Sequence, residues 1–147
     1  MRLRRPRSGE IVAVIAAVAL AVLTFLPWYH APNGNLTAWD EFGVADVLIV
    51  LAVLGGLTLF VATITERSTA LPVASAVWTT LLAFIATLAV LVVVLDKPDH
   101  ATALRPASWL ALIASAAILA GAWQSMRDER TDCYPRPEPP PRPAPPP

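Results

Sequence analysis

An acidic side chain inside an otherwise apolar stretch is the strongest candidate for chemistry in this sequence. Asp46 is followed by a run of mostly aliphatic residues that continues to Ile64. A charge at the bilayer centre costs about 2.5–3.5 kcal/mol on the insertion scale, so such a carboxylate commonly pairs with a cation or binds an ion or proton. Because Asp46 stands near one end of its run, an inter-helix cap or ion pair, an ion site and simple solvation all stay open. Arg105 and Lys97, from the loop facing that end, are the candidate cationic partners.

The remaining polar residues match no catalytic or metal-binding pattern. The sequence contains no Ser/His/Asp array, no glycine-rich phosphate loop and no H-E-x-x-H motif. The single cysteine, Cys133, excludes an intramolecular disulfide and with it the membrane disulfide oxidoreductases, which need cysteine pairs. We therefore expect no enzyme, no cofactor and no metal. The spacing fits no metal motif even for the histidines and acids outside the apolar stretches, namely His30, His100, Asp40, Glu41, Asp96 and Asp99.

The elements that must position Asp46 and Arg105 are four long apolar stretches. The chain has 147 residues, is 56% hydrophobic and has a mean hydropathy of +0.57. Each stretch approaches the roughly 20 residues that a helix needs to cross a hydrocarbon core of about 30 Å. Lipid offers the backbone no hydrogen-bond partner, so each stretch must be helical, and short loops favour an up-down-up-down order. We predict an all-α, four-helix transmembrane bundle with helices at about 11–28, 38–65, 71–95 and 107–126.

The distribution of charge predicts the orientation of this bundle. Every Lys and Arg except Lys97 and Arg105 lies before the first stretch, between the second and third, or after the fourth. Because cytoplasmic loops carry the excess of positive residues, both termini are expected in the cytoplasm. Pro32 follows Ala31 and disfavours signal-peptide cleavage there, so the first helix is expected to be retained. High Ala and Arg with little Lys indicates a bacterium, and hence a multi-pass protein of the plasma (inner) membrane.

Two polar segments flank the helices. Residues 1–10 form a basic arm that is expected to set topology and that also favours anionic headgroups. Residues 127–147 form a proline-rich cytoplasmic tail, which we predict to be disordered and extended as polyproline II. Within the tail, Arg136, Pro137 and Pro140 belong to a P-x-x-P pattern with a flanking arginine. Such a pattern can dock into an aromatic groove, although a solvated spacer is the alternative.

Aromatic residues mark the two expected membrane boundaries. Trp28, Tyr29 and Trp109 are predicted to lie in the outer interfacial belt with Trp39, and Trp123 in the inner one. Trp78 is farther from the outer boundary and is predicted to be a packing residue. Residues 29–36 are expected to form an exterior loop, with Thr37 as the N-cap of a helix that starts near Ala38 and Asp40 three residues further on.

Small residues recur at four-residue spacing in every predicted helix. Such stripes let helix backbones approach closely in lipid, and we interpret them first as intramolecular contacts and second as oligomer contacts. They are Ala13, Ala17 and Ala21; Ala52 and Gly56; Thr79, Ala83 and Thr87; and Ala117 and Gly121.

Several short motifs carry a family resemblance over about residues 8–129. They are Ser8-Gly9-Glu10, Phe25-Leu26-Pro27-Trp28-Tyr29, Leu36-Thr37-Ala38-Trp39 with Phe42 and Asp46, Ala70-Leu71-Pro72-Val73-Ala74, Trp109-Leu110, and Gly121-Ala122-Trp123 leading into Ser125-Met126-Arg127-Asp128-Glu129. In these motifs the chain resembles a family of small four-helix integral membrane proteins of actinobacteria. The resemblance implies the four-span topology and supplies no activity.

We expect a non-enzymatic scaffold or regulator of another membrane component, acting through its helices and tail. The alternative is a small oligomeric transporter or channel with Asp46 near its outer mouth. The expected partners are the lipid bilayer and a membrane protein or further copies of the chain. Apart from the short basic arm, the sequence offers no support for nucleic-acid binding.

Overall fold

The computed structural model describes residues 8–32, 34–41, 43–65, 70–96 and 101–131. Within these ranges the chain forms four α-helices, which are α1 (Ser8–Leu23), α2 (Val44–Ile64), α3 (Ala70–Leu95) and α4 (Pro106–Thr131). Some predictions concern residues outside the described ranges and stay predictions. These residues are 1–7 of the basic arm, Lys97, His100, Cys133, and Arg136, Pro137 and Pro140 of the tail.

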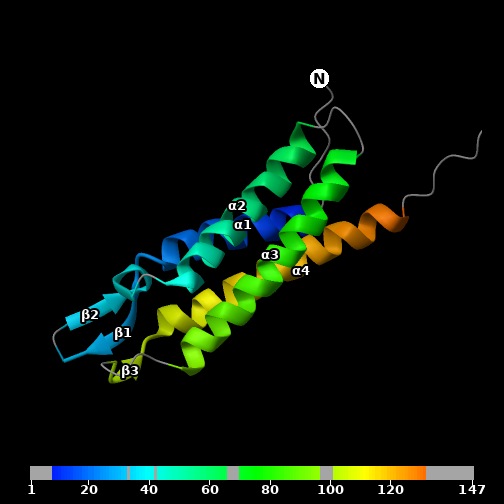
Figure 1. Cartoon of the computed structure of the whole chain (residues 1–147). Coiled ribbons are helices and arrows are strands. Elements are labelled where there is room, and N and C mark those ends of the chain that lie inside the picture. The colour runs from blue at the N-terminus through cyan, green and yellow to red at the C-terminus, as the bar shows by residue number, and fades with distance from the viewer. Residues whose placement is uncertain (1–7, 33, 42, 66–69, 97–100, 132–147) are drawn as a thin grey trace, which may run out of the picture.

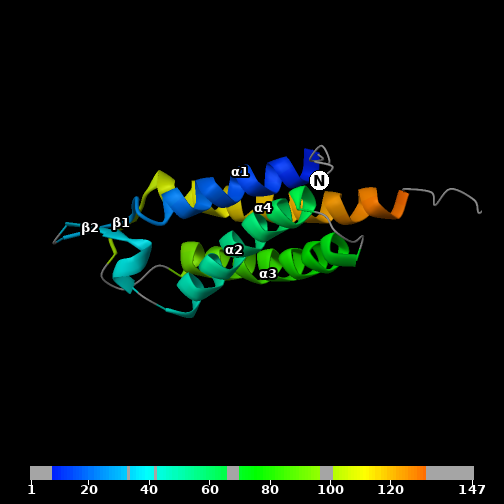
Figure 2. The same cartoon turned by 90° about the horizontal axis from the view of Figure 1, so that it is seen from above.

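The four helices pack as a bundle in which each helix packs mainly against two neighbours, with a smaller contact between α2 and α4 (Figures 1 and 2). α1 and α3 each pack against both α2 and α4. Among the described helices, three are long and apolar enough to cross a membrane, over Val44–Ile64, Ala74–Leu95 and Pro106–Asp128. α1 is apolar but shorter, with 16 residues. The mostly helical fold and the apolar helices agree with the predicted membrane protein.

Small side chains fill the places where the helices meet. Ala13 and Ala17 of α1, Ala52 of α2 and Ala83 of α3 are each 0% exposed. A Cβ atom on Gly56 would lie only 2.8 Å from the Ala17 Cβ, so α1 and α2 approach as closely as two such residues allow. The prediction that the small-residue stripes make intramolecular contacts is therefore confirmed for these positions.

The first helix differs from the prediction at both ends. Helix α1 begins at Ser8 and ends at Leu23, whereas 11–28 was expected. Pro27 lacks the N–H that would bond to the Leu23 carbonyl in a continued helix. That carbonyl oxygen instead accepts from the Leu26 backbone N–H at 3.2 Å and from the Trp28 indole Nε1 at 2.7 Å. The apolar residues after Leu23 thus leave the helix and enter a strand.

A small antiparallel sheet replaces most of the expected exterior loop at 29–36. Strand β1 (Pro27–Ala31) pairs with β2 (Gly34–Thr37) on one side and with β3 (Ala103–Leu104) on the other. Gly34 has a φ of 141° at the tight turn, a conformation that favours glycine. All three strands lie at one end of the bundle (Figure 1). The all-α prediction is therefore incomplete. It missed both the local hairpin of β1 and β2 and the distant strand β3, which pairs Leu104 with Tyr29.

The second helix also starts later than predicted. Residues Ala38–Glu41 form a 3₁₀ turn, and α2 begins only at Val44. The predicted Thr37–Asp40 contact does form, since the Asp40 carboxylate accepts from the Thr37 backbone N–H and hydroxyl. This contact closes the short turn rather than opening α2. The expected helices at 71–95 and 107–126 correspond to α3 and α4, whose observed bounds differ at the ends by up to five residues.

Two aromatic predictions are wrong. Trp28 and Tyr29 are buried at 1% and 2% exposure rather than lying in an interfacial belt. Trp78, predicted to be a packing residue, is 63% exposed on the outer surface of the bundle. Trp109 and Trp123 are about half exposed, and their place at the membrane boundaries stays a prediction.

Candidate functional site

The two buried aromatics of β1 attach the sheet to the helix ends beneath it. The Trp28 Nε1–H donates to the Leu23 carbonyl oxygen at 2.7 Å, and the Tyr29 hydroxyl donates to the Val93 carbonyl oxygen at 3.0 Å. Both carbonyls belong to the last turn of a helix, where backbone oxygens have no partner within the helix. Trp28 and Tyr29 therefore cap the C-terminal ends of α1 and α3, and they hold the sheet in a fixed position on the bundle.

Arg105 lies on the outer surface of this sheet, immediately after β3. Its backbone N–H donates to the Trp28 carbonyl oxygen at 2.9 Å. Its guanidinium Nη2 donates to the Asn35 Oδ1 at 2.7 Å and lies 3.4 Å from the His30 Nδ1. The His30 Nδ1 is in turn 3.2 Å from the same Asn35 oxygen. His30, Asn35 and Arg105 form a polar group, which we call the exterior cluster after the side of the membrane predicted for it.

The exterior cluster is suited to binding a carboxylate. A guanidinium is planar and permanently charged, and its forked N–H donors match the two oxygens of a carboxylate. Among the described residues, the side-chain contacts of Arg105 involve only Nη2. Nη1 and Nε are thus available for an acidic group outside the part of the chain that the structure describes. No group of three His, Cys, Asp or Glu side chains that could hold a metal occurs among the described residues.

Asp46 lies in the first turn of α2 and is 6% exposed. Its Oδ2 accepts from the backbone N–H of Gly43 at 2.9 Å, an N–H at the start of the helix. A carboxylate at this position satisfies an unpaired donor and opposes the positive end of the helix dipole. The structure does not bring Asp46 to Arg105, since each bonds to a different residue, and the other predicted partner, Lys97, lies outside the described residues.

Asp40 is a second carboxylate near the sheet, and it is solvent-exposed. The backbone N–H of Thr37 donates to its Oδ2 at 2.6 Å and the Thr37 hydroxyl at 2.9 Å. These bonds, the backbone one first, favour the ionised form and hold the pKa of Asp40 below its ordinary value.

Sequence reasoning missed three residues with a structural role around these sites. Asn35 is expected only as part of the exterior loop at 29–36. Thr102 has no predicted role, although its backbone N–H and hydroxyl both donate to the His30 carbonyl oxygen. Glu10, expected only within the basic arm, is 3% exposed. Its spacing from Ala13 and Ala17, at i+3 and i+7, is the signal that could have placed it on the buried face of α1.

Comparison with known proteins gives no further identification. No protein-family model, no curated protein and no solved structure matches this chain. The resemblance to the actinobacterial four-helix family stays a prediction.

Proposed function

We propose that this protein is a four-span, non-enzymatic scaffold or regulator that holds another membrane component through the exterior cluster. The observation that supports this best is the fixed position of the Arg105 guanidinium, which bonds to Asn35 at 2.7 Å on a sheet anchored by two buried aromatics. The ligand it suits is an acidic side chain on the exterior segment of a partner. The proline-rich tail is the second contact we propose, on the cytoplasmic side.

The proposed orientation places the sheet outside a bacterial plasma membrane and both termini in the cytoplasm. Three helices have the length and composition of membrane spans. With 16 residues, α1 is about 24 Å long at 1.5 Å per residue, and it packs along α4 in the same bundle. The excess of arginines on the side away from Lys97 and Arg105 supports the cytoplasmic assignment of the termini.

A scaffold accounts for the interior of the bundle better than a transporter does. The helices meet through fully buried alanines and closely approaching glycines. The carboxylate of Asp46 is engaged with the Gly43 N–H of its own helix start. A solute path would therefore have to form between copies of the chain.

The test is quantitative co-purification from native membranes in a mild detergent. The samples are the full chain, Arg105→Gln, Arg127→Gln and a chain truncated after Arg130. Glutamine keeps a donor for Asn35 but removes the charge, so a partner held by the exterior cluster should be recovered about tenfold less with Arg105→Gln. Arg127→Gln tests an arginine at the opposite end of α4, outside the exterior cluster. A partner held by the exterior cluster should be retained by it, whatever the variant does to bound lipid.

Three other outcomes are informative. A partner lost only on truncation would move the contact to the tail and reject the exterior cluster as the docking site. Recovery of self-associated chain alone, unchanged by any variant, would reject the scaffold and turn attention to flux in liposomes. Independently, a topology reporter fused after Met126 should report a cytoplasmic position, and a periplasmic signal would overturn the orientation.

A further inference from the structure

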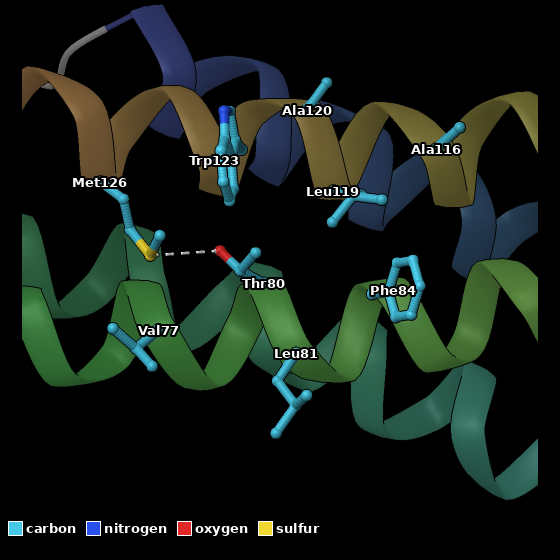
Figure 3. Close-up of a pocket in the computed structure, with 9 residues that line it drawn as sticks. All are labelled: Val77, Thr80, Leu81, Phe84, Ala116, Leu119, Ala120, Trp123 and Met126. Carbon is cyan, nitrogen blue, oxygen red and sulfur yellow. Dashed lines mark hydrogen bonds between the residues drawn. The ribbon is translucent and has the colours of Figure 1, made fainter.

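A groove between α3 and α4 opens on the outer surface of the bundle, on the half of α4 that leads to its C-terminal end. It has a volume of about 570 Å³ and is lined almost entirely by apolar side chains. Figure 3 shows Met126, Trp123 and Leu119 of α4 facing Thr80 and Phe84 of α3 across it. Ala116 and Ala120 of α4 also line the groove, and Figure 3 shows their methyl groups on the side of α4 away from α3.

The hydroxyl group of Thr80, which lines the groove, is satisfied within the protein. The Thr80 hydroxyl donates to the Ala76 carbonyl oxygen of its own helix at 2.7 Å and lies 3.7 Å from the Met126 sulfur. An occupant of the groove thus meets hydrocarbon and sulfur and needs no hydrogen-bonding group of its own. This suits an acyl chain.

The dimensions of the groove match one leaflet of a bilayer. From Ala116 to Met126 it follows α4 for about 15 Å at 1.5 Å per residue, which is half of a hydrocarbon core of about 30 Å. Its volume lies within the range of about 300–1,000 Å³ that small-molecule sites occupy.

A positive charge stands at the end of the groove. Arg127 is exposed and lies four residues after Trp123, on the same face of α4 one turn further on. The acidic neighbour Asp128 lies about 100° around the helix from Arg127, off the stripe that lines the groove. Apolar lining followed by a guanidinium is complementary to an acyl chain followed by a phosphate.

We propose that this groove binds one anionic phospholipid of the cytoplasmic leaflet, with an acyl chain between α3 and α4 and its phosphate at Arg127. The assignment to the cytoplasmic leaflet rests on the proposed function, which orients the C-terminal end of α4 inward. The binding itself requires only that α3 and α4 lie in a membrane.

Trp123 reports directly on occupancy, because bromine atoms on an acyl chain quench a tryptophan in contact with them. The purified chain is placed in nanodiscs of phosphatidylcholine that contain increasing fractions of acyl-brominated phosphatidylglycerol or, separately, acyl-brominated phosphatidylcholine. The chain has five tryptophans, so the Trp123 signal is taken as the difference from Trp123→Phe. We expect the phosphatidylglycerol curve to saturate at a lower fraction, by about fivefold for one interfacial arginine.

Two variants and a matched control decide the interpretation. Ala120→Phe fills the groove from an exposed position and should abolish the preference, while Ala19→Phe makes the same change at an exposed alanine of α1 and should leave it intact. Arg127→Gln should remove the preference for phosphatidylglycerol and keep quenching by both lipids. Equal quenching by the two lipids in the unaltered chain would overturn the proposal. If Ala120→Phe instead changes the oligomeric state and leaves the lipid preference unaltered, the groove binds a second copy of the chain. That result would also reject the lipid proposal.

This assay contains no protein partner and no oriented membrane. Its failure would leave the Arg105-dependent capture of a partner untouched, and the loss of that capture would leave the lipid titration valid. The two proposals can therefore fail separately.

Discussion

Gly9 of α1 and Gly121 of α4 lie against each other so closely that neither has room for a side chain. A Cβ atom on Gly121 would lie 2.5 Å from the Gly9 carbonyl oxygen, and one on Gly9 would lie 2.7 Å from the Gly121 carbonyl oxygen. In lipid, where no hydrophobic drive brings helices together, such close backbone contact supplies the packing that holds them. This contact keeps the short first helix beside α4.

We expect Gly121→Ala to destabilise the protein by about 1–3 kcal/mol, since the added methyl group meets backbone that can yield only by separating the helices. The measurement is the unfolding midpoint in mixed micelles with increasing SDS. Gly55→Ala is the matched control, because its Cβ would lie 3.4 Å from the Thr79 hydroxyl oxygen, an ordinary contact. That control should be neutral or up to about 1 kcal/mol more stable, as alanine favours a helix. A tolerated Gly121→Ala would show that α1 and α4 can separate at little cost.

The cap that the Tyr29 hydroxyl forms on α3 can be tested by removing that hydroxyl group. Tyr29→Phe keeps the buried ring but leaves the Val93 carbonyl oxygen without this donor, so we expect a loss of about 0.5–1.5 kcal/mol. The change should also raise amide hydrogen exchange in the last turn of α3. Trp109→Phe, at a half-exposed position, serves as the comparison and should change neither quantity. Equal protection of α3 in Tyr29→Phe would argue against the capping role.

Asp40 makes stability depend on pH in a defined direction. Bonds from Thr37 lower its pKa in the folded protein relative to the ordinary value of 3.8. The group therefore stabilises the fold above that ordinary value, and its contribution disappears as the pH falls through the lowered folded pKa. Asp40→Asn should be less stable than the unaltered chain near neutral pH, and the gap should close below pH 3.8. Thermal unfolding in detergent across this range is the measurement, and a gap that widens on acidification would contradict the assignment.

Asp46 distinguishes the scaffold from the transporter. Asparagine keeps an acceptor for the Gly43 N–H, so Asp46→Asn should have a small effect on stability, whereas Asp46→Ala should cost about 1 kcal/mol as the loss of a cap. Co-purification of a partner should survive both changes. If purified protein instead conducts ions or solute in liposomes, and Asp46→Asn abolishes that flux at unchanged stability, the transport alternative would replace the scaffold.

The pattern of apolar and small residues determined the helices and the faces through which they pack. The second, third and fourth stretches contain the three candidate spans, and Pro106 marks the start of α4 as its missing N–H allows. Ala13, Ala17 and Gly56 meet as their four-residue spacing predicted. These features depend on local backbone hydrogen bonding and on burial, and both can be predicted from short segments of the sequence.

Only the tertiary structure decided the third strand of the sheet and the partners of Arg105. Arg105 bonds to Asn35, 70 residues away in the chain, and Tyr29 bonds to Val93, 64 residues away. The burial of Trp28 depends on the position of β3 beside β1. The periodicity of the sequence around Trp28 does not predict that position. Asp46 differs from these residues, because its observed partner, the Gly43 N–H, lies only three residues away in the chain. The contacts of Arg105 and Tyr29 form only when segments far apart in the chain pack together, so a short window of sequence does not predict them.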